Sequence, residues 1–478
     1  MERQNNSSFT ILTLLFLFSV VLASPPSSWP YFHPNSGQTS IAIPDQIDTS
    51  WQVNFGDSIQ IYPTISPITG WINQHQQEVV YLGTSIGVFC VSVDHGQIIW
   101  FYHTTQPVKY TPAYWDTNRL YVPAGDSLIC LNPTTGQWLW GYHCSGNLFH
   151  VIGLGDYVGV VDDSSYVYVF AYQTNQLAWR SELLSPKGGC DNTSLVLDSH
   201  GCVYVVTGGN QSAYYDFKIF KFNLDSGQVV WSSAEGPLWE PGGVRMSPVL
   251  RHDSILVFGT HTDFGWTSSI YNYRTSDHWR TYRQTFTYSD GPVMASPAVD
   301  SGGHTYFPTA NFFLALDDSN GQIRQYDFPF DASSPVIDPN HKIIFGTLDG
   351  RLIVIDQTNG LISEFPCSGD LASPAIGSDG SIYIAGNNTI YKFSASLGQP
   401  EGSVKVVKRN DCFGVHPNPF HQQLMVDGAS GLVEIYALNG RLLCRAKQPG
   451  LFKWRTNGLP GGVYLVKINR QIFKVVKD

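Results

Sequence analysis

The feature that most constrains the fold is a short pattern that recurs along most of the chain. In residues 343–360, IIFGTLDGRLIVIDQTNG, two apolar runs flank the stretch GTLDG, and a second turn follows from Asp356 to Gly360. Short apolar runs between Gly- and Asp-rich stretches are typical of buried β-strands joined by tight turns. Two such strands cannot enclose a core, so the unit is expected to stack against copies of itself.

The second turn of this pattern returns five more times. Its copies lie at residues 92–96, 132–136, 171–175, 223–227 and 317–321. An aromatic residue follows each turn closely, in the order Trp100, Trp140, Trp179, Trp231, Tyr326 and Phe365. Four of the copies end in Gly and one in Asn, the residues that best tolerate the positive φ of such a turn.

A second marker precedes each unit. Short apolar strands begin at Ser66-Pro67, Ser247-Pro248, Ser296-Pro297, Ser334-Pro335 and Ser373-Pro374, with Thr111-Pro112 as a variant and His150-Val151 and Ser194-Leu195 in the two remaining places. The markers define eight units. Four short strands in a unit of about 40 residues is the period of a β-propeller blade. We therefore predict an all-β fold with an eight-bladed β-propeller over residues 51–397.

The two ends of the repeat region complement each other. Trp51 has no hairpin of its own before it, whereas the last unit, residues 381–393, lacks a closing turn and a Trp. A propeller that builds one blade from both ends leaves no open sheet edge. Trp51 is therefore expected on the outer strand of the blade that residues 373–394 begin.

The N-terminal residues predict export. Arg3 precedes an apolar stretch at residues 11–22, and Val21-Leu22-Ala23 is a suitable cleavage site, so residues 1–23 are interpreted as a cleaved signal peptide. The alternative is an uncleaved anchor, for which the stretch is short. Residues 24–50, rich in Pro, Ser and Asn, are expected to form a loose leader.

Charge divides the chain near residue 400. Residues 24–400 hold 15 Lys and Arg against 32 Asp and Glu, whereas residues 401–478 hold 12 against 5. The acidic part argues against nucleic acid as a partner. Residues 398–411 are interpreted as a linker and residues 412–478 as a separate module. Strands at 433–436, 463–468 and 472–476, with a hairpin turn at Asn439-Gly440, predict a small Ig-like β-sandwich.

The candidate binding residues lie in the two longest units. Inserts near residues 208–216, 232–245 and 260–288 are rich in aromatic residues, and long loops on a rigid scaffold often carry binding. The ligand-binding candidates are Trp239, Glu240, Asp263, Trp266 and Tyr271. Aromatic faces suit a glycan or a protein partner, and the two carboxylates provide an alternative, acid/base cleavage of a glycosidic bond.

No catalytic or metal motif stands out. The sequence lacks HExxH and a phosphate loop, and the pairs Asp162-Asp163 and Asp317-Asp318 are interpreted as turn residues. Eight cysteines show no CxxC spacing. Cys90 and Cys130 occupy equivalent strand positions and are interpreted as buried thiols, with a disulfide as the alternative. We expect no catalytic residue, no metal and no cofactor.

The repeat resembles that of pyrroloquinoline-quinone (PQQ) type propellers. Residues 79–100 read VVYLGTSIGVFCVSVDHGQIIW, and the likeness extends over residues 51–394. It implies eight blades with Trp side chains docked between them. The quinoprotein dehydrogenases of this superfamily hold PQQ against two adjacent cysteines, which this chain lacks, and many other members are binding or assembly proteins without a cofactor.

The tail resembles the C-terminal sorting domain of type IX secretion. The matching pieces are HPNPF at residues 416–420, VEIYALNGRLL at 433–443, GLPGGVYLVKI at 458–468 and FKVVK at 473–477. The resemblance implies the type IX secretion machinery as a partner and the medium or the outer-membrane surface as the location. The residues it places in the sorting signal are Pro417, Asn418, Pro419, Gly440, Gly458, Leu459, Gly462, Tyr464 and Lys474. An Ig-like adhesive or carbohydrate-binding module is the alternative.

These observations predict an exported or cell-surface binding and scaffold protein. Its extracellular ligand is expected to be a glycan or a protein. The alternative function is that of an extracellular enzyme, either a PQQ-type oxidoreductase or a carbohydrate-active enzyme.

Overall fold

The computed structural model divides the chain into two compact units, Met1–Leu397 and Gly398–Asp478, which are described separately. It describes residues 32, 34–73, 76–184, 193–208, 217–233, 244, 246–260, 267–287, 293, 295–309, 312–327, 333–357, 361–395, 414–416, 423–437, 441–455, 459–468 and 471–477. In this part of the chain, no helix is long and apolar enough to cross a membrane.

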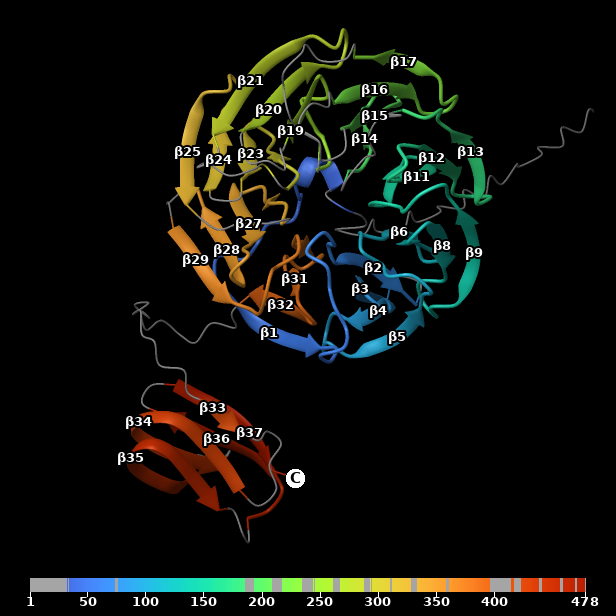
Figure 1. Ribbon diagram of the computed structural model, residues 1–478. Coiled ribbons are helices and arrows are strands. Elements are labelled where there is room, and N and C mark those ends of the chain that lie inside the picture. Colours follow the sequence, from blue (N-terminus) through green and yellow to red (C-terminus); the bar gives the residue numbers. More distant parts are fainter. Residues whose placement is uncertain are drawn as a thin grey trace, which may run out of the picture. The chain divides into compact units, whose positions relative to one another are not determined.

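The strands of the first unit form four-stranded antiparallel sheets set side by side in a ring, the arrangement of a β-propeller (Figure 1). Each sheet is given from its inner to its outer strand. Sheet 1 is β2 (Ile68–Ile72), β3 (Gln77–Thr84), β4 (Gly87–Ser92), β5 (Ile98–His103); sheet 2 is β6 (Ala113–Asp116), β7 (Arg119–Ala124), β8 (Ser127–Leu131), β9 (Trp138–His143); and sheet 3 is β10 (Ile152–Leu154), β11 (Tyr157–Val161), β12 (Val167–Ala171), β13 (Gln176–Arg180). Sheet 4 is β14 (Val196–Leu197), β15 (Cys202–Thr207), β16 (Lys218–Asn223), β17 (Val229–Ser232); sheet 5 is β18 (Val249–Arg251), β19 (Ile255–Thr260), β20 (Thr267–Arg274), β21 (Arg280–Thr287); sheet 6 is β22 (Ala298–Val299), β23 (Thr305–Pro308), β24 (Phe312–Leu316), β25 (Gln322–Asp327); and sheet 7 is β26 (Val336–Ile337), β27 (Lys342–Gly346), β28 (Arg351–Asp356), β29 (Leu361–Pro366).

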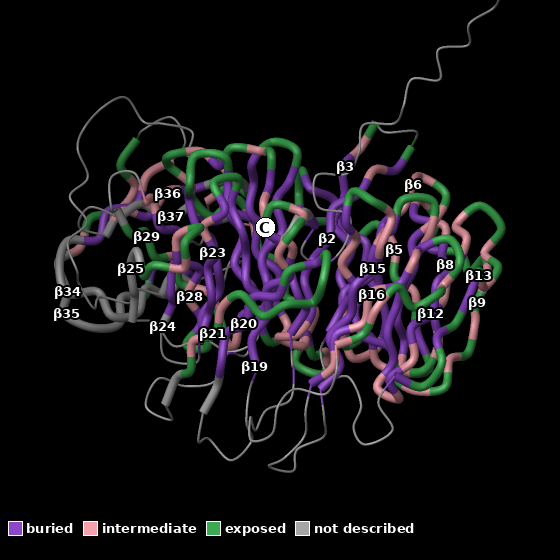
Figure 2. The backbone as a smooth tube through the Cα atoms, turned by 90° about the horizontal axis from the view of Figure 1, so that it is seen from above, coloured by how far each residue is buried: buried purple, intermediate pink, exposed green. Residues whose placement is uncertain are grey.

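The middle strands of each sheet are buried on both faces because neighbouring sheets cover them. Every residue of β4 and β27 is buried, which explains why these strands appear in the sequence as continuous apolar runs. The outer strand β5 alternates instead between exposed and half-buried residues. Figure 2 shows this gradient as buried strands inside the ring and exposed turns at its margins. The inner layers therefore supply the core, and the outer strands meet solvent.

The ring closes through a sheet built from both ends of the repeat region. Sheet 8 consists of β30 (Ala375–Ile376), β31 (Ile382–Gly386), β32 (Thr389–Ala395) and β1 (Ile47–Asn54), which pairs with β32 and lies outermost. Its inner strand β30 lies beside β2 of sheet 1. Trp51 stands opposite Lys392, and its indole N–H donates to the Val93 carbonyl at 2.8 Å. The prediction that Trp51 completes the last sheet is confirmed.

Trp side chains of other outer strands also reach the next sheet. The indole N–H groups of Trp100, Trp179 and Trp231 donate to the carbonyls of Pro133, Leu224 and Thr275 at 2.9, 2.6 and 3.1 Å. A glycine of the neighbouring turn makes room for the ring. Gly136 has φ 70°, and a Cβ there would lie 2.7 Å from the Trp100 ring. The regular turn–Trp spacing therefore encodes a contact between successive sheets.

The N-terminal segment differs from the expected loose leader. Phe32 is 4% exposed, η1 (Pro34–Gly37) follows it near the middle of the ring (Figure 1), and Ile43 is 2% exposed. The Ile43 N–H donates to Asp338 Oδ2 at 2.9 Å, and Lys342 Nζ donates to the Ile43 carbonyl at 2.7 Å. The expectation was wrong for Phe32 and Ile43, which are buried, and the partners of Ile43 are supplied by sheet 7, almost 300 residues away.

The second unit is a five-stranded antiparallel sheet. Its strands are β33 (Gly414–His416), β34 (Gln423–Ala437), β35 (Leu442–Arg455), β36 (Gly462–Ile468) and β37 (Gln471–Lys477), in the order β33-β34-β36-β37 with β35 paired to β34. Its core comprises Leu424, Val433, Ile435, Trp454, Tyr464, Val466 and Val475. The predicted strand at 433–436 is the second half of the longer β34, whose pairing with β35 is interrupted by a bulge after Val426.

Candidate functional site

The long connections of the first unit leave its sheets at one end of the ring, here called the loop end. In a four-stranded antiparallel sheet, the link from strand two to strand three and the link to the next sheet start from the same end. Thr207, Ser232 and Thr260 are the last strand residues before three such connections, in sheets 4 and 5. The opposite end, here called the turn end, carries tight turns such as those at Gly96 and Asp300.

Four of the predicted ligand-binding residues belong to these connections. Trp239, Glu240, Asp263 and Trp266 lie outside the described residues. In the sequence, these residues follow strands that end at the loop end. Their role in ligand binding stays a prediction.

Tyr271 is a core residue, unlike the surface residue that was expected. It lies in β20 between β19 and β21 and is 1% exposed. Its ring centroid is 4.9 Å from that of Phe217 and 5.5 Å from that of Phe258. The expectation failed because residues 267–274 and 280–287, taken as part of a long insert, form regular strands of sheet 5. Burial removes the Tyr271 ring from direct contact with a ligand.

The Ser-Pro markers belong to hydrogen bonds that join the inner strands around the ring. In each bond, the backbone N–H at one marker donates to the side chain at the next, as in Ser66 to Thr111 Oγ1 (2.8 Å), Thr111 to His150 Nδ1 (3.2 Å), Ser247 to Ser296 Oγ (2.9 Å), Ser296 to Ser334 Oγ (3.0 Å) and Ser334 to Ser373 Oγ (2.8 Å). We call this series the inner belt. The donors and acceptors of the inner belt are buried. Each bond therefore gives a backbone N–H the hydrogen-bond partner that water would supply in an exposed chain.

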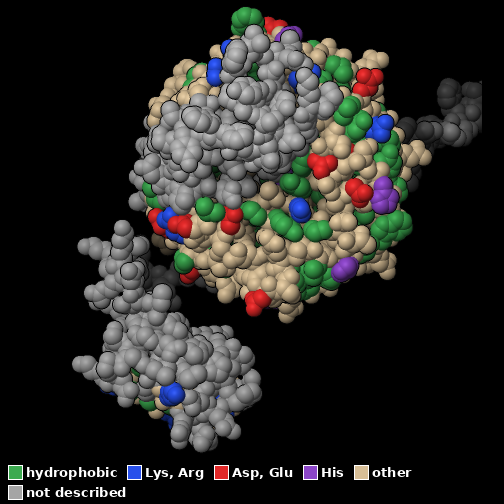
Figure 3. Space-filling view, viewed as in Figure 1, with side chains coloured by type: hydrophobic (Ala, Val, Ile, Leu, Met, Phe, Trp, Pro, Cys, Tyr) green, Lys and Arg blue, Asp and Glu red, His purple; other side chains and the backbone are tan. Residues whose placement is uncertain are grey.

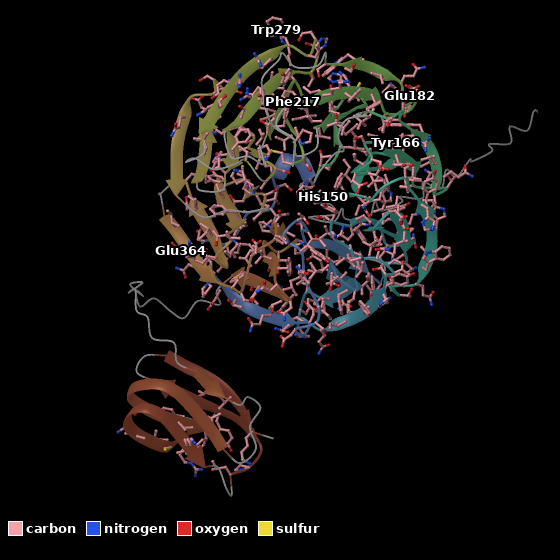
Figure 4. The ribbon with its side chains drawn as sticks, viewed as in Figure 1. His150, Tyr166, Glu182, Phe217, Trp279 and Glu364 are labelled. Carbon is pink, nitrogen blue, oxygen red and sulfur yellow. The ribbon has the colours of Figure 1, made fainter. Side chains whose placement is uncertain are left out.

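A pocket of about 390 Å³ lies along the inner strands of sheets 3 to 5. Phe32, Ile152, Leu195, Ser247, Val249 and Asp253 are among the residues that line it. Phe32 stacks on His150, with ring centroids 3.7 Å apart and planes at 12°. Figure 4 shows His150 close to the middle of the ring. The N-terminal segment thus contributes one wall of this inner pocket.

The turn end combines buried carboxylates with histidines. Asp300 is 4% exposed, and its Oδ2 lies 2.9 Å from His304 Nδ1, 3.0 Å from the Tyr306 hydroxyl and 3.4 Å from His341 Nδ1. Burial raises the pKa of Asp300, but hydrogen bonds from the His304 side chain and backbone outweigh it and leave that pKa below its usual value. Since His341 belongs to sheet 7, this carboxylate also links two sheets.

The Asp pairs noted in the sequence are turn residues. Asp162 accepts hydrogen bonds from the Tyr166 N–H and the Tyr168 hydroxyl, and burial raises its pKa. Asp317 accepts from the Gly321 N–H at 2.7 Å. In the described part of the chain, no group of three or more His, Cys, Asp and Glu residues could hold a metal ion. In Figure 3, charged side chains on the viewed face are scattered among neutral ones rather than gathered in one patch.

The predicted sorting residues fall partly within the described tail. Tyr464 is 4% exposed, its hydroxyl donates to the Pro460 carbonyl at 2.6 Å, and its ring packs against Trp454. Leu459 packs against the same core, and Gly462 begins β36. Lys474 lies in β37 opposite Leu465. Pro417, Asn418, Pro419, Gly440 and Gly458 lie outside the described residues.

Comparison with known proteins supports the propeller. Residues 85–327, which are 243 of the 478 residues, match the family model described as outer membrane protein assembly factor BamB. No curated protein sequence matches the chain. Similar solved structures include BamB from Moraxella catarrhalis, with a TM-score of 0.54 and 12% identity over 73% of this chain and 100% of that one.

Two similar structures are enzymes. Quinohemoprotein alcohol dehydrogenase from Comamonas testosteroni has a TM-score of 0.59 and 15% identity, covering 80% of this chain and 83% of that one. A europium-containing methanol dehydrogenase has a TM-score of 0.57 and 12% identity, covering 76% and 98%. At such identities the likeness concerns the fold alone. The expected PQQ-like propeller is thereby confirmed.

Proposed function

We propose that this chain, which belongs to the family described as outer membrane protein assembly factor BamB, is an exported binding and scaffold protein built on an eight-bladed propeller. Each four-stranded sheet would be one blade. The family supports a scaffold or binding role, and the fold likeness to dehydrogenases does not by itself carry an activity. The ligand is taken to be an extracellular glycan or protein, with no nucleic acid.

The observation that supports this proposal is that the two ends of the ring differ. The loop end carries the long connections, whereas the turn end carries tight turns. Trp side chains and the inner belt join successive sheets, so the strand ends are held in fixed positions. The connections after Thr207, Ser232 and Thr260 all start from the loop end of sheets 4 and 5. Variable connections on a fixed scaffold are the usual location of a binding surface.

A binding test would use the mature chain. A glycan array and cross-linking to outer-membrane proteins of the host would identify the ligand, and the double variant Trp239→Ala plus Trp266→Ala should then lose at least about tenfold in affinity. Trp138→Ala, at an outer-strand position that is 56% exposed, is the matched control and should bind normally. Undiminished binding by the folded double variant would place the ligand elsewhere.

A dehydrogenase assay would separate this proposal from its rival. The purified chain would be mixed with PQQ, calcium, an alcohol and a redox dye. We expect no enzyme-dependent dye reduction. Dye reduction that follows the protein concentration would instead establish an oxidoreductase and overturn the scaffold proposal.

We further propose that residues 1–23 direct export and that the second unit is a sorting domain for the type IX secretion machinery, with an Ig-like sandwich as its architecture. Support comes from the resemblance of the tail sequence and from the separate apolar core of this unit. Its excess of basic residues contrasts with the acidic first unit. The protein would then reach the medium or the outer-membrane surface.

A further inference from the structure

The N-terminal segment pairs with the inner edge of sheet 7. Gln38 forms a parallel bridge with Ile337, and the Thr39 N–H donates to the Ile337 carbonyl at 2.9 Å. β26 is the innermost strand of its sheet, and η1, just before Gln38, lies near the middle of the ring (Figure 1). The inner edge of one sheet therefore already binds an extended segment that runs in the same direction as the inner strand.

Sheet 4 presents the same backbone groups. In an antiparallel pair of strands, hydrogen-bonded and non-hydrogen-bonded residue pairs alternate. The Asp338 N–H donates to the first residue of β27 at 3.0 Å, so Ile337 directs its N–H and C=O away from β27. The Asp198 N–H likewise donates to the Cys202 carbonyl at 2.9 Å, so Leu197 directs its N–H and C=O away from β15. Leu197 is thus the counterpart of Ile337.

The inner pocket runs along this edge of β14. In the described part of the chain, β14 pairs with β15 alone. Residues 194–197 line the pocket together with Ile152 of sheet 3, Val249 of sheet 5 and Phe32, and Leu197 is half-buried. The volume of about 390 Å³ is within the range of small-ligand sites. A strand edge beside apolar side chains suits a peptide, which has both a polar backbone and side chains.

The charge in the pocket lies at its turn end. Asp253 is the charged residue among those that line it, and its side chain is 33% exposed. Its Oδ1 accepts the Ser199 N–H at 3.0 Å, and its Oδ2 accepts the Ser199 hydroxyl and lies 3.4 Å from His200 Nδ1. A carboxylate has about four acceptor positions, so it can also accept from a cation. A segment parallel to β14 has its C-terminal residues at this end.

We propose that the inner pocket binds a short extended peptide that pairs in parallel with β14 at Leu197 and carries Lys or Arg at its C-terminal end. The peptide would continue an interface that the N-terminal segment has begun, because that segment pairs with sheet 7 and its Phe32 forms a wall of the pocket. This site on the inner strands is separate from the loop-end surface proposed above, and neither depends on the other.

The test uses the mature full chain and tetrapeptides of the form acetyl-X-Thr-X-Lys-amide, in which X is Val, Ile, Leu or Phe, measured by ligand-observed NMR. β-Branched and aromatic residues favour the extended conformation. At least one peptide should bind, and the tightest is taken further. Exchange of its Lys for Glu should weaken binding about twofold to fivefold, the range for an exposed ion pair.

Backbone methylation distinguishes strand pairing from binding through side chains alone. Successive N–H groups of an extended peptide point to opposite edges, and a paired strand uses one edge. Methylation of the first and third nitrogens, or of the second and fourth, should therefore weaken binding at least about fivefold in one form and little in the other. Equal binding by both methylated forms and the parent peptide would overturn the proposal, as would failure of every tetrapeptide to bind.

A proline substitution locates the site. Leu197→Pro removes the N–H that points away from β15 and keeps the β14–β15 hydrogen bonds, so it should weaken peptide binding about threefold to tenfold. Val299→Pro is the matched control. Val299 precedes Asp300 in sheet 6 as Leu197 precedes Asp198, and it does not line the pocket, so this variant should bind the peptide as wild type does.

A cross-linking measurement on the wild-type protein needs no variant. The peptide carries photo-leucine at its first position, and mass spectrometry identifies the residues it labels. Labels should fall within residues 152–155, 194–197 or 247–250, which line the pocket. Labels found only elsewhere, or a folded Leu197→Pro variant that binds the peptide as tightly as wild type, would overturn the proposal.

Discussion

Trp51 makes its closing contact with a carbonyl that lies 42 residues further along the chain. Its indole donates to Val93 and its ring lies against Gly96, so it spans the joint between the last and first sheets. Trp51→Ala should lower the free energy of unfolding by about 2–4 kcal/mol, because a large ring and a hydrogen bond are lost. Urea unfolding followed by circular dichroism measures this.

Trp279→Ala provides the control for that experiment. Its side chain is 67% exposed, so its removal should change the unfolding midpoint little. Equal midpoints for Trp51→Ala and wild type would contradict a closing role for Trp51.

Asp300 should make part of the stability depend on pH. Its folded-state pKa is lowered, so its contribution is fully present above the unfolded pKa of about 4 and is lost as pH falls through the folded value. Asp300→Asn should therefore be less stable than wild type at pH 7, with a difference that narrows below about pH 4. Urea midpoints at pH 7, 5 and 3 test this. A difference that stays constant over that range would contradict it.

At the scale of elements, the N-terminal segment is fastened by one buried lysine. Lys342 is 4% exposed. Its Nζ donates to the Ile43 carbonyl at 2.7 Å and to Asp45 Oδ1 at 2.8 Å. Lys342→Met keeps the apolar stem and removes both bonds. The hydrogen bond from this buried ammonium to the Ile43 carbonyl contributes about 1.5–3 kcal/mol, so the Ile43 amide should exchange at least about tenfold faster.

The exchange experiment has two internal references. Amides of β27, such as Ile344, should keep their wild-type protection because the strand pairing is untouched. Lys109→Met removes an exposed lysine and should leave the Ile43 amide unchanged. Loss of protection throughout sheet 7 would mean that Lys342 supports the sheet rather than the segment.

At the scale of the whole molecule, the first unit closes without the tail. Sheet 8 is complete with β1 and β30–β32, and the second unit has its own core. Deleting residues 404–478 should therefore leave a folded propeller that stays in the periplasm. Deleting residues 471–478 should act similarly, because it removes β37 and the core residue Val475 and exposes the edge of β36.

Cell fractionation with an antibody against the first unit measures both deletions. Full-length protein should appear in the medium or at the cell surface. If either truncated form reached the same place in the same amount, the tail would be an adhesive module and the type IX proposal would fail.

The sequence by itself determined the repeating architecture. Turns such as that at Gly136 and buried runs such as β27 depend on residues close in the chain, so their spacing revealed a propeller and the closing role of Trp51. The same local reasoning identified the Ser-Pro markers as strand starts, although it did not reveal their inter-sheet bonds.

Only the tertiary structure decided which distant segments meet. Ile43 bonds to a residue 295 positions away, and Phe32 stacks on His150, so no local pattern could predict the fastened N-terminal segment. The prediction that Tyr271 belongs to a binding insert was wrong, because its burial depends on the pairing of β20 with β19 rather than on the length of the unit. The inner pocket arises where three sheets present their first strands together, which no local pattern in the sequence reveals.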